Sequence, residues 1–522
     1  MRHSARFDLC LLVSYMPLAP APSYFCLYAS PSCPETVSVV ERDAQIAALA
    51  QRQAQVTPAT CAPPATSMDT AYLLLRYAAA ALLTLMVTTR IRRHLRKRKV
   101  VAFLHPYAAQ GGGGERVLWV AVAALRKARP DVRIVIYSGD GLSGKELVAH
   151  ARERFGVAVP DVTIQRVCTR RLTAAKTWPV ATMAGQALGA MILAAESVLR
   201  TPPDVLVDTT GLAFGIPIAK LLAGCAAAAY VHYPAVSQDM LDALDTPAFN
   251  NSKRWVRLRR VKAVYYRLLG KVYGWCGRRH DVVMANSSWT RGHISSVWGR
   301  GALLAYPPCG AMKGITRKEN GKVIVLSLAQ FRPEKDQMKQ LEAWSLLPPS
   351  VRRKAKLVVA GAVRHADDQR ILDALKRQAA GMDGVEFLVS APRHEIMARL
   401  QTASIGLHTM RLEHFGIAVV EFMAAGLVVV AHASGGPLLD IVGETGERGF
   451  VATDARDYAT KLASVIEMDA SQRRKIGENA RAFVAERFSD SAFGRTFVSA
   501  LAVLLNPQRP PAAATVLKGG LN

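Results

Sequence analysis

The feature that most constrains the fold of this chain is an alternation of short aliphatic runs with helical stretches along most of its length. The first run, residues 100–107, passes through glycines into the apolar helical stretch ERVLWVAVAALRKA. Strands separated by helices pair in parallel, so this order predicts an α/β fold with parallel sheets. Similar runs stand at residues 133–138, 203–210, 226–234, 281–287, 323–331, 356–362, 385–391, 403–409 and 427–433.

The strand pattern pauses at YPPCGAMKG, residues 306–314, and a polar stretch then leads into the next strand. A chain of 522 residues is also too long for one ordinary domain. We therefore predict two Rossmann-like domains, at residues 100–310 and 311–505, followed by a tail at 506–522.

An apolar run before the first strand predicts a membrane anchor at residues 69–99. Residues 70–89 contain one charge, Arg76, and a helix of that length rises about 30 Å, the thickness of a bilayer core. Seven cations follow between Arg90 and Lys99. The positive-inside rule then places everything downstream in the cytosol.

Two further segments bear on the membrane arrangement. Residues 1–67 are rich in Pro, Ala and Ser, and we expect a poorly ordered leader, which is not translated if Met68 is the initiator. Residues 178–199 are apolar but carry Gln186 and Glu196. We favour a buried or amphipathic helix there, because a second span would separate the later strands from the earlier ones, although entry into the membrane stays open.

The formal net charge of +27 would suit a polyanion, but its distribution does not indicate a nucleic-acid binder. Ten cations and no acid lie between Lys253 and Arg279, interleaved with aromatic and aliphatic residues. This pattern suits anionic lipid head groups, or alternatively an amphipathic helix packed on its own domain. No recognised nucleic-acid-binding motif is present, and nucleic acid is not expected as a partner.

The eight cysteines show no CxxC pair and no regular spacing. This argues for reduced thiols and against both a disulfide framework and a zinc site.

A glycine-rich segment, residues 110–115, lies between a predicted strand and a predicted helix. Its four glycines permit close approach of a ligand, and the helix that follows directs free N–H groups at an anion, so a phosphate site is indicated, with a simple tight turn as the alternative. The segment 139–146 resembles a nucleotide-binding loop, but Glu146 stands where a Ser or Thr would bind magnesium. We therefore expect no NTPase.

A pair of glutamates eight residues apart, Glu413 and Glu421, lies where a strand end enters an apolar helix. Carboxylates placed in this way can each bind a pair of sugar hydroxyls. Arg332 and Lys335 follow another strand end, where α/β proteins bind ligands, and could neutralise a diphosphate. The turn SGGP, residues 434–437, follows a third strand.

These motifs occur in the order found in retaining GT-B glycosyltransferases. From about residue 69 to 500, the chain resembles the eukaryotic asparagine-linked glycosylation mannosyltransferases. The segments that carry this resemblance are HPYAAQGGGGERVLW, YVHYPAVSQDML, ANSSWT, QFRPEKDQ, EHFGIAVVEFMAAG and SGGPLLDIV.

The resemblance implies two Rossmann-like domains facing a cleft, the first facing the acceptor and the membrane and the second holding the nucleotide sugar, with the last helix crossing back. It implies α-1,2 transfer of the fourth and fifth mannoses from GDP-mannose, with retention, to the dolichol-diphosphate oligosaccharide. It further implies a single-pass protein of the endoplasmic reticulum membrane. The implied partners are GDP-mannose, the dolichol-diphosphate oligosaccharide, membrane lipids and other mannosyltransferases of the pathway.

The resemblance also implies roles for individual residues. His232, Arg332, Lys335 and Glu413 form the catalytic group, with the two cations on the diphosphate and Glu413 on the mannose hydroxyls. Related enzymes commonly carry the arginine two residues earlier, where this chain has Gln330, so Arg332 is the less secure of the two cations. The donor-binding group is Gly111, Gly112, Gly113, Gly114, Phe415, Gly416, Glu421 on the ribose, Gly435 and Gly436.

No Asp-x-Asp pair, by which many glycosyltransferases hold a metal, occurs in the sequence. We therefore expect no cofactor and metal-independent transfer, with charge on the leaving phosphate met by fixed cations and helix N-termini. Two alternatives remain: a membrane-tethered nucleotide-sugar binding protein without activity, and a related glycosyltransferase with another sugar or lipid acceptor.

Overall fold

The computed structural model describes residues 67–159, 162–236, 259–310 and 321–506. The predicted leader up to residue 66, the tail from residue 507 and residues 311–314 of the predicted domain boundary at 306–314 lie outside these residues. The chain divides into two compact units between Tyr77 and Ala78, inside the first helix described, α2 (Ser67–His94).

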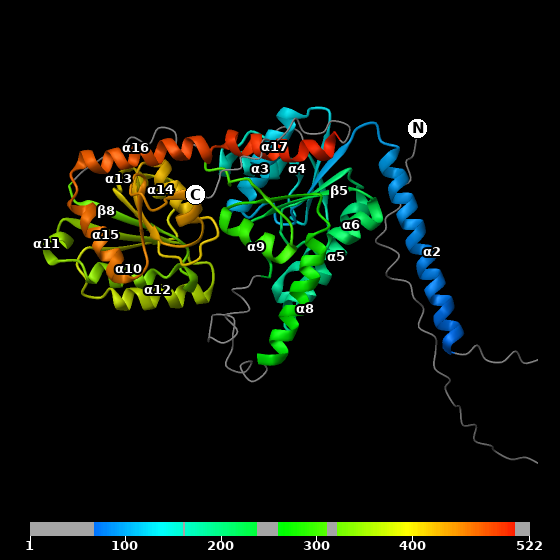
Figure 1. Cartoon of the computed structure of the whole chain (residues 1–522), viewed down its shortest axis with the longest axis horizontal. Coiled ribbons are helices and arrows are strands. Elements are labelled where there is room, and N and C mark those ends of the chain that lie inside the picture. Colours follow the sequence, from blue (N-terminus) through cyan, green and yellow to red (C-terminus); the bar gives the residue numbers. More distant parts are fainter. Residues whose placement is uncertain (1–66, 160–161, 237–258, 311–320, 507–522) are drawn as a thin grey trace, which may run out of the picture. The chain divides into compact units, whose positions relative to one another are not determined.

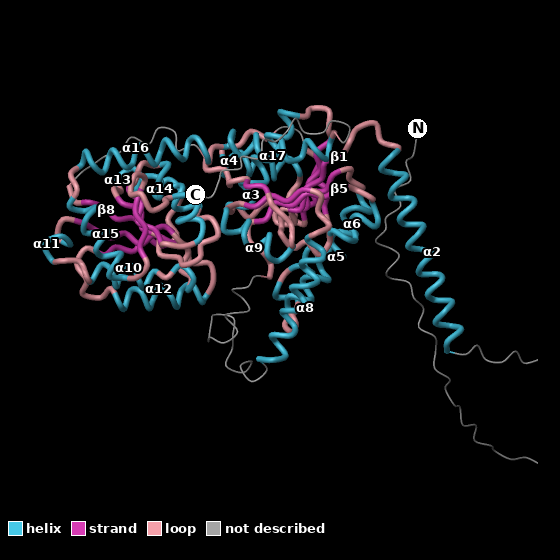
Figure 2. The backbone as a smooth tube through the Cα atoms, in the orientation of Figure 1, coloured by secondary structure: helices cyan, strands magenta, loops and turns pink. Residues whose placement is uncertain are grey.

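Two wholly parallel sheets carry the second unit (Figure 2). The first has the order β3-β2-β1-β4-β5-β6-β7 and the second the order β10-β9-β8-β11-β12-β13. The strands of the first sheet are β1 (Val100–Leu104), β2 (Arg133–Ser138), β3 (Thr163–Arg166), β4 (Val205–Asp208), β5 (Ala226–Val231), β6 (Val282–Ala285) and β7 (Leu303–Leu304). Those of the second are β8 (Val323–Leu328), β9 (Ala355–Gly361), β10 (Val385–Val389), β11 (Ile405–Leu407), β12 (Val428–His432) and β13 (Gly449–Ala452).

Helices cover both faces of the first sheet, as the continuous aliphatic runs require. One face packs on α3, α4 and α17, and the other on α5, α6, α8 and α9. These helices are α3 (Gly113–Ala128), α4 (Gly144–Phe155), α5 (Thr182–Arg200), α6 (Ile216–Ala223), α8 (Arg259–Gly277), α9 (Ser288–Trp298) and α17 (Asp490–Leu505).

The second sheet is likewise enclosed, with α13, α14 and α16 on one face and α10, α12 and α15 on the other (Figure 1). The bounds are α10 (Gln337–Ser345), α11 (Pro349–Arg352), α12 (Ala366–Gln378), α13 (Arg393–Thr402), α14 (Ile417–Ala424), α15 (Ala455–Glu467) and α16 (Ala470–Arg487).

The last helix, α17, belongs to the core of the first sheet although it follows the second in sequence. Phe497 stacks on Phe103 of β1, with ring centroids 6.1 Å apart. At the start of the helix, one nitrogen of Arg116 donates to both carboxylate oxygens of Asp490, at 2.7 and 2.9 Å. The end of the chain that the structure describes is thereby held on the first sheet.

Three helical segments among the described residues are long and apolar enough to cross a membrane: Thr70–His94, Thr182–Arg200 and Ala470–Leu505. The apolar part of the first has none of its residues buried, and it extends beyond the predicted 70–89 through the cationic flank. The second, α5, has 44% of its apolar part buried. Glu196 of α5 accepts hydrogen bonds from the backbone of Cys168 and Thr169.

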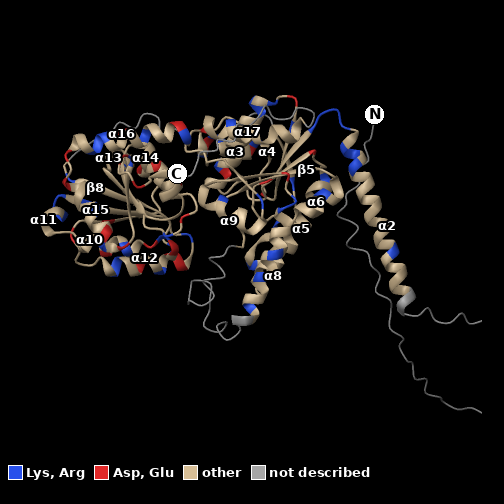
Figure 3. Ribbon diagram, in the orientation of Figure 1, with Lys and Arg blue, Asp and Glu red and all other residues tan. Residues whose placement is uncertain are grey.

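Several arginines of the cationic flank contact the first sheet's helices, and Figure 3 shows the cations gathered at that end of α2. Arg90 donates to the carbonyl of Leu221, at 3.0 Å, and Arg92 to that of Leu199, at 2.7 Å. These carbonyls lie at the C-terminal ends of α6 and α5, where the helix dipole favours a positive charge. The flank therefore holds the end of α2 on the domain.

Helix α8 covers most of the basic aromatic stretch; residues 253–258 of that stretch lie outside the described residues. One side of α8 is buried in the domain through Leu269, Tyr273 and Cys276. A second side is apolar and exposed, with members three or four residues apart: Val261, Val264, Leu268, Val272 and Trp275. The packing of α8 on its own domain is confirmed for the buried side, and contact of the exposed side with lipid stays a prediction.

The four cysteines in the described residues, Cys168, Cys225, Cys276 and Cys309, are free.

Candidate active site

The candidate site lies at the carboxyl ends of β8 and β11, the point in the second sheet where the strand order reverses direction. Ligands of open α/β sheets bind at this switch point, because the two connections leave in opposite directions and open a crevice between them. The turn with Arg332 and Lys335 follows β8. Glu413 follows β11, so two motifs 78 residues apart in sequence meet here.

Lys335, Glu413 and His408 form the centre of this site. Lys335 Nζ lies 2.8 Å from Glu413 Oε2, and His408 Nε2 lies 3.3 Å from the same oxygen. Burial alone would raise the pKa of Glu413, but the hydrogen bond from His408 and the charge of Lys335 lower that pKa to about 2. Glu413 is therefore ionised at neutral pH, and its side chain stays 16% exposed.

Buried polar contacts hold the two strand ends together. Thr409 donates from its hydroxyl to the carbonyls of Lys335 and Asp336, at 2.9 and 3.0 Å, and accepts from Gln340 at 2.9 Å. The hydroxyl of Tyr458 donates to the carbonyl of His408 at 2.9 Å. Because the Thr409 hydroxyl both donates to the Lys335 turn and accepts from α10, the Lys335 turn and the Glu413 loop are preorganised with respect to each other.

Arg332 differs from Lys335 in its surroundings. Its side chain is 40% exposed, and its nearest carboxylate is Glu334, at 3.8 Å. The structure therefore brings Lys335, and not Arg332, to Glu413.

The glycines of the SGGP turn pack directly on the Glu413 loop. A Cβ on Gly435 would meet the carbonyl oxygen of Glu413 at 2.3 Å, and one on Gly436 would meet that of Phe415 at 2.4 Å. The N–H of Gly436 also donates to the carbonyl of Glu413, at 2.8 Å. The two glycines therefore let the SGGP turn pack closely on the Glu413 loop, and a role of Gly435 and Gly436 in donor binding stays a prediction.

The loop then passes into α14, which carries Glu421. Gly416 is the N-cap of α14 with φ of 103°, a conformation that favours glycine. Phe415 is buried against Tyr306 and Phe488. Burial raises the pKa of Glu421, while the charges of Arg393 and Arg116 act in the opposite direction.

The glycine loop lies at the N-terminus of α3. Gly111 has φ of 76°, and Gly113 is the first residue of the helix. The N–H of Gly112 donates to Glu115 Oε2 at 2.7 Å, so a residue of the chain itself satisfies this donor. Any phosphate contact must therefore come from the other N–H groups of the loop.

His232 lies beside this loop. A Cβ on Gly114 would stand 3.6 Å from His232 Nε2, and this buried nitrogen has no hydrogen-bond partner among the described residues. Burial lowers the pKa of His232 to about 4, although Asp208 opposes the shift, so the imidazole is neutral. Its neighbour Tyr233 has its ring 5.5 Å from that of His414, next to Glu413.

Two histidines that the sequence did not single out, His408 and His105, lie near the predicted site residues Glu413 and His232. His105 Nδ1 lies 2.7 Å from Thr209 Oγ1, and its Nε2 lies 4.0 Å from Glu115 Oε1. Both histidines directly follow buried strands, β1 and β11, where a lone histidine also suits a core position. The sequence could have indicated them only by their position, because each stands at the end of a predicted strand, as the recognised motifs do.

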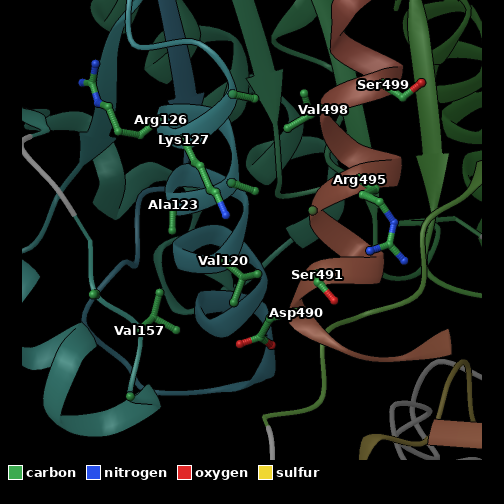
Figure 4. Close-up of a pocket in the computed structure, with 15 residues that line it drawn as sticks. Val120, Ala123, Arg126, Lys127, Val157, Asp490, Ser491, Arg495, Val498 and Ser499 are labelled. Atoms are coloured by element: carbon green, nitrogen blue, oxygen red, sulfur yellow. The ribbon is translucent and has the colours of Figure 1, made fainter. Parts of the chain in front are cut away.

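The described residues also bear on metal binding and on grooves outside the candidate site. No group of three or more His, Cys, Asp or Glu side chains in that part of the chain could hold a metal ion; metal independence stays a prediction. A groove of about 1060 Å³ lies between α3 and α17 (Figure 4) and is lined by residues such as Val120, Lys127 and Arg495. None of the predicted site residues lines it.

Known proteins and protein families match this chain over nearly all of its described residues. A family model described as ALG11 mannosyltransferase N-terminus matches residues 98–298, and one described as Glycosyl transferases group 1 matches residues 311–483. A human GDP-Man:Man(3)GlcNAc(2)-PP-Dol alpha-1,2-mannosyltransferase is 40% identical, over 78% of this chain and 87% of the relative. Proteins of the same name from Xenopus laevis and Dictyostelium discoideum are 40% and 35% identical. The first match covers 77% of this chain and 87% of the relative, and the second covers 78% and 85%.

Solved structures show the same fold. Sucrose-phosphate synthase from Thermosynechococcus elongatus superposes with a TM-score of 0.59 at 15% identity, over 78% of this chain and 100% of that one. Anabaena HepE in complex with UDP and glucose gives 0.52 at 18% identity, over 77% and 99%. Together with the two parallel sheets, these likenesses identify the GT-B fold. The chain is a GT-B glycosyltransferase, and it belongs to the family of the GDP-Man:Man(3)GlcNAc(2)-PP-Dol alpha-1,2-mannosyltransferases.

Proposed function

We propose that this chain transfers mannose from GDP-mannose, in α-1,2 linkage and with retention, onto a dolichol-diphosphate oligosaccharide. The names of its relatives supply the donor and the acceptor. The observation that carries the proposal is the preorganised cluster of Lys335, His408 and ionised Glu413 at the switch point of the second sheet. A cation for a diphosphate and a carboxylate for sugar hydroxyls lie in one place, which is what a nucleotide-sugar donor requires.

In this proposal Lys335 binds the diphosphate and Glu413 binds the mannose hydroxyls. The ammonium group of Lys335 has three N–H donors, so it can contact a phosphate while it keeps its contact with Glu413. Charge grows on the leaving phosphate as the sugar–phosphate bond breaks, and a fixed cation stabilises that charge without reorganisation. Neither step uses a metal.

Retention follows if acceptor and leaving group use the same face of the sugar. The bond between the sugar's C1 and the β-phosphate oxygen breaks, and its electrons leave with the phosphate. The acceptor hydroxyl oxygen bonds to C1, and its proton passes to the departing phosphate oxygen. Neutral His232, beside the glycine loop, would contact the sugar near the reacting carbon. The chain would add the fourth and the fifth mannose by two such transfers.

We further propose that α2 spans the membrane of the endoplasmic reticulum once, with both sheets in the cytosol. The exposed apolar side of α8 would then rest on the lipid surface. Arg267 and Lys271 are exposed beside it, and cations next to apolar residues favour an anionic interface.

The direct test is transfer by the purified full-length protein onto a synthetic lipid-linked trimannosyl acceptor, with radiolabelled GDP-mannose and other nucleotide sugars in parallel. We expect label from GDP-mannose in a product that an α-1,2-mannosidase releases. Donor binding without transfer would indicate a binding protein without activity. Transfer from another nucleotide sugar would indicate a different glycosyltransferase.

A further inference from the structure

We propose that His408 is a positioning residue that orients the carboxylate of Glu413 and leaves one of its oxygens, Oε1, for the donor sugar. This inference rests on the proposed function. It goes beyond the predicted roles because it assigns separate tasks to the two oxygens of one carboxylate and adds a residue that no motif contains.

The two hydrogen-bond donors from the protein meet on the same oxygen. Lys335 Nζ and His408 Nε2 lie 2.8 and 3.3 Å from Glu413 Oε2. Oε1 accepts no hydrogen bond from a side chain or backbone group that the structure describes. Because the side chain of Glu413 remains 16% exposed, this second oxygen has its lone pairs available to a ligand.

The protonation of His408 follows from its partners. Glu413 is ionised and can only accept, so the hydrogen must lie on His408 Nε2. The other ring nitrogen, Nδ1, is buried without a partner in the described part of the chain. A histidine that only filled the core would have no reason to direct its donor at a carboxylate and leave an acceptor unsatisfied. The arrangement therefore favours a role for His408 in contacting Glu413 over a role in core packing alone.

His408 is also rigidly placed. Its N–H donates to the carbonyl of Val430 at 3.0 Å, its carbonyl accepts from Tyr458, and the residue is 4% exposed. Lys335 must share its N–H groups with a diphosphate when the donor binds, whereas His408 has no second partner to serve. The histidine thus keeps the carboxylate oriented while the lysine's contacts change.

Substitutions that move or remove one N–H group test this assignment. His408→Gln keeps an N–H close to the Nε2 position, His408→Asn places one near Nδ1, and His408→Ala has none. We expect His408→Ala and His408→Asn to lower kcat by about tenfold to a hundredfold, the range for losing a hydrogen bond to a charged group. We expect His408→Gln to stay within about threefold of the wild type, and the donor KM to change less than kcat in all three.

The pH dependence of activity distinguishes a positioning role of His408 from a purely structural one, because only a positioning role predicts a changed pKa of Glu413. The hydrogen bond from His408 lowers the pKa of Glu413. In His408→Ala, which lacks this bond, the fall of kcat/KM on the acid side should therefore occur at a higher pH, whereas in His408→Gln it should occur at the same pH as in the wild type. His150→Gln, on α4, is the matched control, and thermal melting checks folding. Equal activity of the Gln and Asn variants, or an unmoved acid limb in a folded Ala variant, would overturn the inference. Absence of transfer by the wild type would instead refute the proposed function.

Discussion

Replacing Lys335 by alanine removes the cation that, among the described residues, lies at the carboxylate of Glu413. The ammonium lies 2.8 Å from Glu413 Oε2, and the two side chains are 23% and 16% exposed. A hydrogen bond between charged groups in such a partly buried setting contributes about 1.5 to 3 kcal/mol. The folded enzyme should therefore become less stable by an amount in this range, because Glu413 keeps only His408 as a partner.

The effect on catalysis should be larger than the effect on stability. In the proposed function Lys335 binds the leaving diphosphate, and the negative charge of that diphosphate is greater in the transition state than in the bound donor. Loss of one preorganised electrostatic group typically costs about 100-fold to 1000-fold in rate. We therefore expect kcat of Lys335→Ala to fall at least about 100-fold, with a smaller change in acceptor binding.

The assay is single-turnover transfer from radiolabelled GDP-mannose by the full-length protein in detergent, with folding checked by thermal melting. Lys339→Ala is the matched control, because Lys339 lies one helical turn further on and pairs with Asp336 at 2.9 Å. An unchanged turnover number in Lys335→Ala would refute the reasoning. So would an equal loss in the Lys339 variant, since the effect would then come from general positive charge.

Three other predictions follow from the same site and from the anchor. Glu413→Gln should chiefly lower turnover and Glu421→Gln chiefly raise the donor KM, because the sugar changes during reaction and the ribose does not; identical kinetic defects would contradict this. Glu413 has a folded pKa of about 2, below its usual 4.5, so it should stabilise the fold by about 3 kcal/mol above pH 4.5 and lose this as the pH falls toward 2. The melting difference between wild type and Glu413→Gln should shrink over that range, and a constant difference would contradict the shift. A glycosylation tag placed after residue 510 should stay unmodified if the domains are cytosolic.

Much of the fold could be predicted because its central strands are buried on both faces and read as continuous aliphatic runs. The runs at 133–138 and 356–362 became β2 and β9 almost residue for residue. Three short strands were missed. All three, β3, β7 and β13, are edge strands, and TIQR in β3 is half-exposed and polar, so neither length nor hydrophobicity distinguishes it from a loop. The third, β7, has only two residues.

Less of the site could be predicted, because motifs identify residue types and not which atoms are already paired. The sequence indicates glycines that allow close approach, but Gly435 and Gly436 are approached by the backbone of the Glu413 loop. It indicates a helix N-terminus for an anion, yet Gly112 already donates to Glu115. His408 stands outside every motif and gains its role only because β11 ends beside the Lys335 turn.

These internal hydrogen bonds limit which groups of the protein can bind the negative charge of the donor diphosphate. With the N–H groups of Gly112 and Gly436 satisfied within the protein, a diphosphate bound as we propose would depend more heavily on Lys335. Lys335 in turn contacts Glu413, and His408, which we propose orients that carboxylate, contacts the same oxygen. Donor phosphate and donor sugar would therefore be bound by a single connected set of three side chains, and their substitutions should not be additive. A double variant lacking Lys335 and His408 should lose less activity than the product of the two single losses, because each removes part of the same orientation of Glu413.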